Sequence, residues 1–95
     1  MSAPDDIASS ARPRLPRGVR LMRDEARGGF VLLAPERVVR ADPVAVAVIE
    51  LCDGARTLSE IVDDLCARYR GERSRIEADV RGLLAKLTAK KMVEL

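Results

Sequence analysis

Residues 42–60 read Asp-Pro-Val-Ala-Val-Ala-Val-Ile-Glu-Leu-Cys-Asp-Gly-Ala-Arg-Thr-Leu-Ser-Glu, and this stretch decides the fold. Asp42 is a favourable helix N-cap, and Pro43 suits the first helical position because its missing N–H needs no partner there. The apolar run that follows predicts a buried helix from Val44 to Cys52. Asp53-Gly54 ends this helix, since glycine readily adopts the left-handed conformation of a helix cap.

Two more helices are predicted downstream. Residues 57–60 form a capping box that opens a helix running to about residue 69, before Gly71. Its apolar positions follow the 3.6-residue period: they are Leu58, Ile61, Val62, Leu65, Cys66 and Tyr69. A second capping box over residues 74–77 opens a helix that ends near residue 91, and the apolar tail at residues 92–95 is expected to pack back onto the core.

Three short strands are predicted upstream, over residues 19–23, 30–33 and 38–41. Gly28-Gly29 and Pro35 mark the two turns between them. Short turns join neighbours into an antiparallel meander, so the third strand is expected to lie at an edge of the sheet. The predicted fold class is α+β in the order βββααα, a three-stranded antiparallel meander followed by a three-helix bundle.

The N-terminal segment differs in composition from the rest. Residues 1–17 contain three prolines and few large apolar side chains, which predicts a disordered tail or a linker ahead of a single domain at residues 18–95. The composition also suits a junction to a preceding domain in a fusion. No apolar run is long enough for a membrane span, so a soluble, cytoplasmic protein is expected.

The residue inventory argues against catalysis. The chain has no histidine, the commonest general acid–base group and a frequent zinc ligand. Cys52 and Cys66 have neither metal-pair nor redox spacing. Asp63 and Asp64 are neighbours on a helix and point about 100° apart. We therefore expect no catalytic residue, no metal site and no cofactor.

A winged-helix or helix-turn-helix DNA-binding regulator is the alternative function, because the last two helices are joined by a short turn. The chain has no Asn or Gln to read base edges, and its net charge is only +2. One face of the last helix is built of small residues: Ala78, Gly82, Ala85 and Ala89. We interpret this face as solvent-exposed helix formers rather than as a surface that a partner approaches closely, although both readings stay open.

The expected edge strand is the best candidate for an interaction site. An exposed edge offers unpaired N–H and C=O groups that an extended peptide can complete by strand addition. Residues 38–41 contain one charge and no proline, so the edge is weakly protected.

Several motifs in this order resemble the PqqD family of pyrroloquinoline quinone (PQQ) biosynthesis. They occupy residues 30–36, 38–42, 49–57, 60–62 and 79–81, and the likeness extends over residues 18–95. Ala34 and Arg37 stand where the family often has Tyr and Gly.

The resemblance implies a winged-helix-like recognition domain for a ribosomally made precursor peptide. Such a peptide chaperone binds the precursor PqqA and presents it to the radical SAM enzyme PqqE; the resemblance also allows fusion to, or association with, PqqC. The peptide would extend the sheet along the third strand, beside the third helix. The implied peptide-binding residues are Arg37, Val38, Val39, Arg40, Ala41, Ile76, Val80, Leu83 and Leu84. The last four also fit plain core positions, and Arg40, Arg75 or Lys86 would pair with acidic residues of the peptide.

Overall fold

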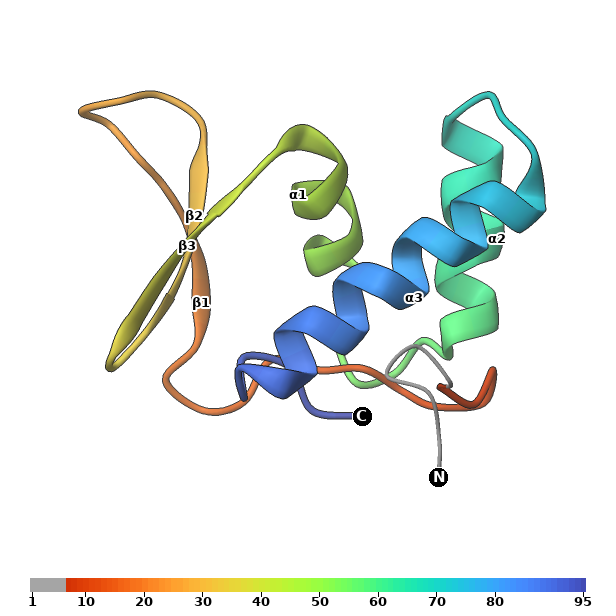
Figure 1. Ribbon diagram of the computed structural model, residues 1–95, viewed down its shortest axis with the longest axis horizontal. Coiled ribbons are helices and arrows are strands. Elements are labelled where there is room, and N and C mark those ends of the chain that lie inside the picture. Colours follow the sequence, from red (N-terminus) through yellow and green to blue (C-terminus); the bar gives the residue numbers. More distant parts are fainter. Residues whose placement is uncertain (1–6) are drawn as a thin grey trace.

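The structure is a computed structural model that describes residues 7–95. A small sheet is packed on one side by three helices (Figure 1). The elements follow in the order β1 (Arg20–Arg23), β2 (Phe30–Ala34), β3 (Arg37–Ala41), α1 (Pro43–Glu50), α2 (Leu58–Arg68) and α3 (Arg73–Ala89). The predicted βββααα fold class is confirmed.

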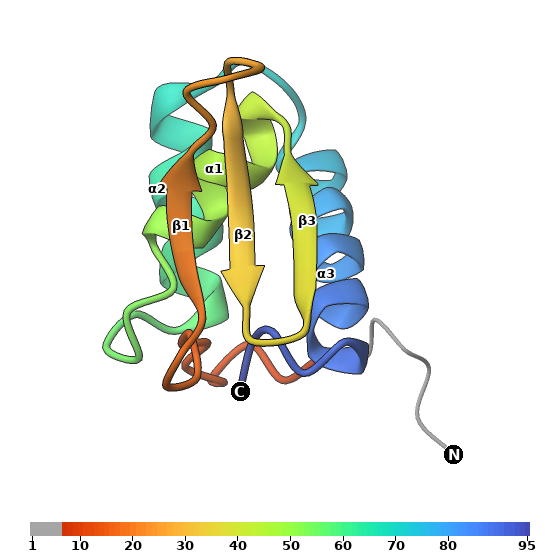
Figure 2. The ribbon, with the colours of Figure 1, turned by 90° about the vertical axis from the view of Figure 1, so that its left-hand side faces the viewer.

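The three strands form one antiparallel sheet in the order β1-β2-β3, so β3 lies at an edge as predicted. Figure 2 shows the sheet face-on, with all three helices behind it and α3 running beside β3. One face of the sheet therefore packs on the helices, and the other face has no helix over it.

Local capping explains where the helices begin. The Asp42 carboxylate accepts the Ala45 N–H at 2.7 Å, and Thr57 and Glu60 form the expected capping box of α2. The predicted capping box at Ser74 is wrong: α3 begins at Arg73 after Glu72, and no side-chain bond caps it. Ser74 already lies within the first turn of α3, because the Glu72 carbonyl accepts the N–H groups of Arg75 and Ile76.

The core lies between the sheet and the helices. Val48, Ile61, Leu84 and Met92 are its most buried members, one from each helix and one from the C-terminal tail. The burial of Met92, together with that of Val93, confirms that the tail packs back onto the core. Tyr69, predicted on the apolar face of its helix, instead follows the end of α2 and is about half exposed.

Residues 7–17, predicted as part of a disordered tail or a linker, make ordered contacts with the rest of the domain, and residues 1–6 lie outside the described part of the chain. Ile7 and Pro13 are buried, and the segment bridges both the loop at Asp53 and the C-terminal residue Glu94. We call residues 7–15 the arm. Composition does not predict this order, because the arm is held by its backbone. The carbonyl groups of residues 9 and 11 accept the first two N–H groups of α2. These N–H groups have no partner within the helix.

Within residues 7–95, no helix combines the length and the apolar character needed to cross a membrane. The same part of the chain contains no group of three or more acidic, Cys or His side chains arranged to hold a metal ion.

Candidate functional site

The free edge of β3 exposes backbone groups at two residues. Ala34 pairs with Arg37 across the two-residue turn Pro35–Glu36. The pair that flanks such a turn exchanges both of its hydrogen bonds, and the pattern then alternates along an antiparallel ladder. The N–H and C=O groups of Val38 and Arg40 therefore point away from β2, toward the free edge.

Figure 2 shows α3 on the same side of the domain as β3, and hollows lie at the two ends of this strand. We define the β3–α3 groove by two hollows, one at each end of β3. The first has a volume of about 480 Å³ and lies between the β2–β3 turn and the C-terminal end of α3. Its lining carries three cations and one carboxylate, and we call it the basic hollow: Ala34, Pro35, Glu36, Arg37, Ala89, Lys90 and Lys91.

The second hollow, of about 440 Å³, lies where β3 passes into α1. Its only charged residues are Asp42 and Asp79, and we call it the acidic hollow; the apolar and small residues of its lining are Val44, Ala45, Val48, Ala78, Gly82 and Leu83. The groove is therefore basic at one end of β3 and acidic at the other.

The two hollows are about five residues of extended chain apart. From Arg37 to Asp42 a strand advances about 17 Å, at roughly 3.4 Å per residue. From Asp79 to Lys90 a helix advances about 16 Å, at roughly 1.5 Å per residue. Because the two walls have matching lengths, one extended segment paired with β3 would reach both hollows.

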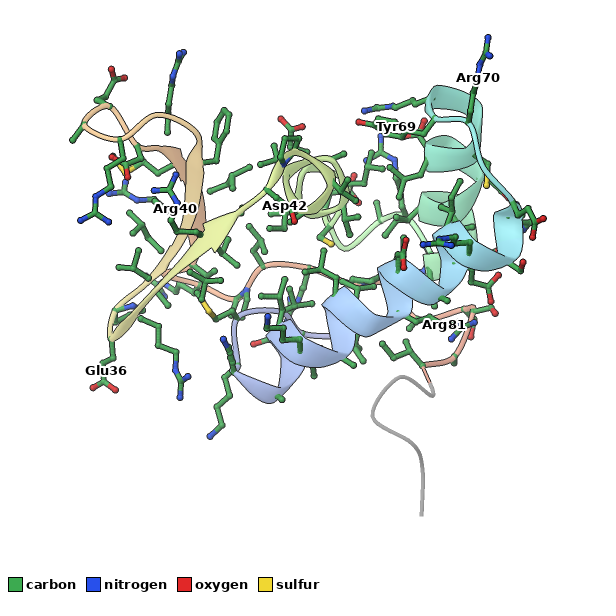
Figure 3. All side chains as sticks on the ribbon, turned by 45° about the horizontal axis from the view of Figure 1, so that its top comes forward. Glu36, Arg40, Asp42, Tyr69, Arg70 and Arg81 are labelled. Atoms are coloured by element: carbon green, nitrogen blue, oxygen red, sulfur yellow. The ribbon has the colours of Figure 1, made fainter. Side chains whose placement is uncertain are left out.

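A third hollow, of about 250 Å³, adjoins the acidic one and shares Val44 and Asp79 with it. We call it the apolar hollow; its other lining residues are Leu65, Tyr69, Arg70, Ile76 and Val80. Figure 3 shows Tyr69 and Arg70 at the end of α2, across from Asp42 at the start of α1.

The structure places the predicted site residues in three different settings. Arg37 lines the basic hollow and Leu83 the acidic one, whereas Ile76 and Val80 line the apolar hollow. On β3, Val39 and Ala41 direct their side chains toward the core. Leu84 has no exposed surface and lines none of the three hollows, so it is a core residue in this structure.

The side chain of Arg40 does not face the groove. Its guanidinium donates to the Asp24 carboxylate at 2.7 Å and to the Gly28 carbonyl at 2.8 Å. Figure 3 shows it on the side of the sheet away from the helices. The expected pairing of Arg40 with an acidic peptide residue therefore conflicts with this contact, although its backbone groups lie at the free edge.

Sequence reasoning missed most residues of the two hollows. Ala78, Gly82 and Ala89 belong to the small-residue face of α3, which we expected to be plain solvent surface; all three line the groove. Small residues let a neighbouring backbone approach a helix closely. Their spacing, together with Asp79 in the first half of α3 and Lys90 directly after its last residue, was the signal available in the sequence.

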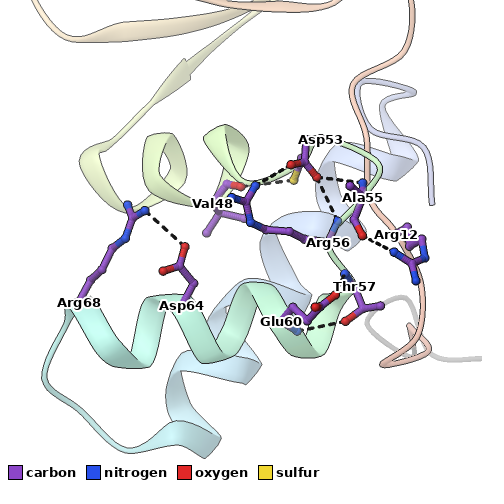
Figure 4. Close-up of polar contacts among 10 residues, drawn as sticks. Arg12, Val48, Asp53, Ala55, Arg56, Thr57, Glu60, Asp64 and Arg68 are labelled. Atoms are coloured by element: carbon purple, nitrogen blue, oxygen red, sulfur yellow. Dashed lines mark hydrogen bonds and ion pairs between the residues drawn. The ribbon is translucent and has the colours of Figure 1, made fainter.

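The motif at residues 53–57, which is among those that carry the family resemblance, has a structural role instead. The Asp53 carboxylate accepts the N–H groups of Ala55 and Arg56 and pairs with the Arg56 guanidinium at 2.6 Å (Figure 4). The Ala55 N–H, followed by that of Arg56, holds the pKa of Asp53 below its ordinary value. Thr57 then caps α2. This turn lies against the arm, through an Arg12 hydrogen bond to the Ala55 carbonyl, and not in the groove.

The linings of the three hollows contain no Cys, Ser, Thr or His side chain. Burial raises the pKa of the Cys52 thiol to about 12, so the thiol stays protonated, and it donates to the Val48 carbonyl. The arrangement is suited to hold an extended segment by hydrogen bonds, shape and charge.

The family model described as "Coenzyme PQQ synthesis protein D (PqqD)" matches residues 29–93. A "PqqA binding protein" of Rhodopseudomonas palustris (strain BisB5) is 44% identical over 84 residues, which cover 88% of this chain and 82% of that protein.

Two solved structures are also similar. The NMR structure of the PqqD truncation of Methylobacterium extorquens PqqCD, described as a functional, stand-alone recognition element for ribosomally synthesized and post-translationally modified peptides (RiPPs), shares 47% identity; the match covers 97% of this chain and 98% of that one, with a TM-score of 0.82. TbiB1 in complex with the TbiA(β) leader peptide shares 26% identity over 85% of this chain and 94% of that one, with a TM-score of 0.73. By the extent of the family match and the identity to its relatives, the chain belongs to the PqqD family.

Proposed function

We propose that this chain is a non-catalytic peptide chaperone of PQQ biosynthesis that binds the precursor peptide PqqA by strand addition to β3. The observation that carries the proposal is the free edge of β3 beside α3, with a hollow at each end. The similar R. palustris protein is named for PqqA binding, and the similar TbiB1 was solved with a leader peptide.

β1 is also an edge strand, but it lacks these surroundings. None of the three hollows is lined by a residue of β1, whereas the basic hollow includes Arg37 of β3 and the acidic one begins directly after β3. Strand addition at β3 gives a peptide both a ladder and side-chain sites, so β3 is the proposed edge.

The charges of the groove suggest what kind of segment binds and in which direction. A carboxylate of the peptide fits the basic hollow, and a cationic side chain about five residues away fits the acidic hollow. We propose antiparallel pairing, which continues the pattern of this sheet and is slightly more stable than parallel pairing. The cationic residue then precedes the acidic one in the peptide.

Delivery completes the proposed role. The chain would hold PqqA at the radical SAM enzyme PqqE and so raise the local concentration of the peptide there. The similar M. extorquens domain is part of PqqCD, which supports an association with PqqC. The proposed site of action is the cytoplasm, where the partner enzymes would work.

Calorimetric and NMR titration with PqqA tests this function. Saturable binding should shift the amide signals of residues 37–41 and of the α3 residues that line the hollows. Binding without any shift at these residues would contradict the groove as the site, and absence of binding would contradict the function.

A matched pair of proline substitutions tests the strand-addition mode. Val38→Pro removes an N–H that points to the free edge of β3, and we expect PqqA to bind about 5- to 150-fold more weakly, since a lost bond with an unsatisfied partner costs about 1–3 kcal/mol. Arg23→Pro removes the equivalent outward N–H of β1 and should leave the affinity unchanged. Circular dichroism checks that both variants stay folded, and equal affinities would exclude β3 as the docking edge.

A further inference from the structure

The face of the sheet that points away from the helices is unusually apolar. The strand register assigns six residues to this outer face: Arg20, Met22, Val31, Leu33, Val38 and Arg40. Four of the six are apolar, and none of these four belongs to the main core cluster under the sheet. Val31 is nevertheless buried, so the exposed apolar surface comes from Met22, Leu33 and Val38. By contrast, every apolar residue of the inner face belongs to the core cluster or packs against it.

This pattern departs from the usual antiparallel sheet, which has one apolar face and one polar face. Met22 is 44% exposed and Val38 is 65% exposed, and both belong to the five exposed large hydrophobic side chains of the described residues. No helix lies over the outer face, which is turned to the viewer in Figure 2. A contiguous apolar surface of this kind, rimmed by charge, is typical of a protein interaction site.

The charges on the outer face indicate the kind of partner. Its two polar members are both arginines, and Asp24, the carboxylate that reaches this face, is engaged by Arg40. Two copies of the chain packed face to face would bring like charges together and would offer Arg20 no carboxylate from the face itself. An apolar protein surface with carboxylates at its rim complements the outer face better.

The outer face also adjoins the proposed peptide site. Side chains of an added strand alternate between the two faces of a sheet, so every second residue of a peptide on β3 would extend the outer face beyond Val38 and Arg40. A protein docked there would contact the peptide and the sheet together.

We propose that the outer face is the docking surface for the enzyme that receives the bound peptide. The apolar centre of this face, at Met22, Leu33 and Val38, would contact the enzyme, and a carboxylate rim of the enzyme would meet Arg20. This inference rests on the proposed function, because it takes the receiving enzyme as the partner. It makes docking of the enzyme separable from binding of the peptide, since the enzyme would use outer side chains and the peptide would use the edge and the groove.

The test compares a double variant, Met22→Thr with Leu33→Thr, with the wild-type chain. Both residues lie on the outer face and outside β3, so the edge that binds the peptide is unchanged, and threonine is β-branched and suits strands. Affinity for PqqE is measured by calorimetry with and without saturating PqqA, and affinity for PqqA alone is measured separately. Leu95→Ser, which removes an exposed apolar side chain outside the sheet, is the control.

We expect the double variant to bind PqqE at least tenfold more weakly while PqqA affinity changes less than twofold. Arg20→Glu should weaken PqqE binding further, and Leu95→Ser should change neither affinity. Unchanged PqqE affinity in the double variant overturns the inference, as does an equal loss of both affinities. Sedimentation showing a wild-type dimer that the double variant abolishes also overturns it, because a second copy would then cover the face. If the wild-type chain does not bind PqqA, only the proposed function is contradicted. The PqqE titration without peptide still tests the outer face.

Discussion

The backbone polar groups of the α1–α2 turn (residues 53–57) are hydrogen-bonded within the chain, whereas those at the free edge of the β3–α3 groove are not. In the turn, Asp53, Thr57 and Glu60 satisfy backbone N–H groups, and the arm satisfies the next two. In the groove, the outward backbone groups of β3 have no neighbouring strand, and the two hollows carry opposite charges. The turn thus stabilises the fold, whereas the groove keeps its binding capacity for another chain. The motifs that carry the family resemblance fall in both regions, since residues 49–57 reach into the turn and residues 38–42 lie on β3 and just after it. A motif therefore identifies the family here without distinguishing a structural role from a binding role.

The largest expected effect separates the core from the groove on α3. Leu84→Ala should lower the free energy of unfolding by about 2–5 kcal/mol, because it opens a cavity in a fully buried position. Leu83→Ala should cost less stability and instead weaken PqqA binding, since Leu83 lines the acidic hollow. Urea unfolding and calorimetry measure the two effects, and a reversed order would place Leu84 in the site.

A pair of glycine substitutions probes the turn. Gly54 has φ +78°, and a Cβ there would lie 3.3 Å from the Arg14 Cβ of the arm. Gly54→Ala should therefore destabilise the fold by roughly 1–2 kcal/mol. Gly82→Ala, in the middle of α3 with open space around it, should stabilise the fold by about 0.5–1 kcal/mol. Equal shifts in thermal unfolding would show that the turn is not constrained by the arm.

Acid should weaken the turn. Hydrogen bonds from backbone N–H groups lower the pKa of Asp53 and, chiefly through Thr57, that of Glu60. A carboxyl whose pKa is lower in the folded state stabilises the fold above its unfolded pKa, and this contribution is lost as the pH falls through the folded pKa. Asp53→Asn should therefore flatten the loss of stability below about pH 4 in a pH series of urea unfolding. Glu25→Gln, at the β1–β2 turn, is the control and should leave the slope unchanged.

The smallest expected effect concerns the charges of the groove. Lys90→Glu or Asp79→Lys should each weaken PqqA binding by up to about fivefold, because exposed ion pairs contribute under about 1 kcal/mol. The doubly substituted chain should regain affinity for a PqqA variant with its groove-facing acidic and basic residues exchanged. Affinities that do not respond to these exchanges would leave strand addition intact and remove the charge order from the proposal.

The order of the elements could be predicted from the sequence because periodicity and capping are local properties. Two helix starts are predicted correctly, the first from Asp42 and Pro43 and the second from the Thr57–Glu60 capping box. The prediction of the third start from Ser74 was wrong, because the turn at Gly71 ends early enough for α3 to begin at Arg73. The edge position of β3 followed from the short turns. The hollows could not be predicted, since they depend on how closely α3 approaches β3, and the arm could not, since its partners are backbone groups far along the chain.

The anchored arm also limits how far anything joined to it can move. If residues 7–15 were loose, they would give an attached domain a leash of roughly 30 Å. Held by α2, by Arg81 on α3 and by Glu94, they add almost nothing to that reach. In Figure 1 the arm starts below α2 and runs beneath α3, across the domain from the β2–β3 turn. A domain carried on the N-terminal side of Ile7 would therefore be held beside α2 and α3, at a high effective concentration for a peptide bound in the groove.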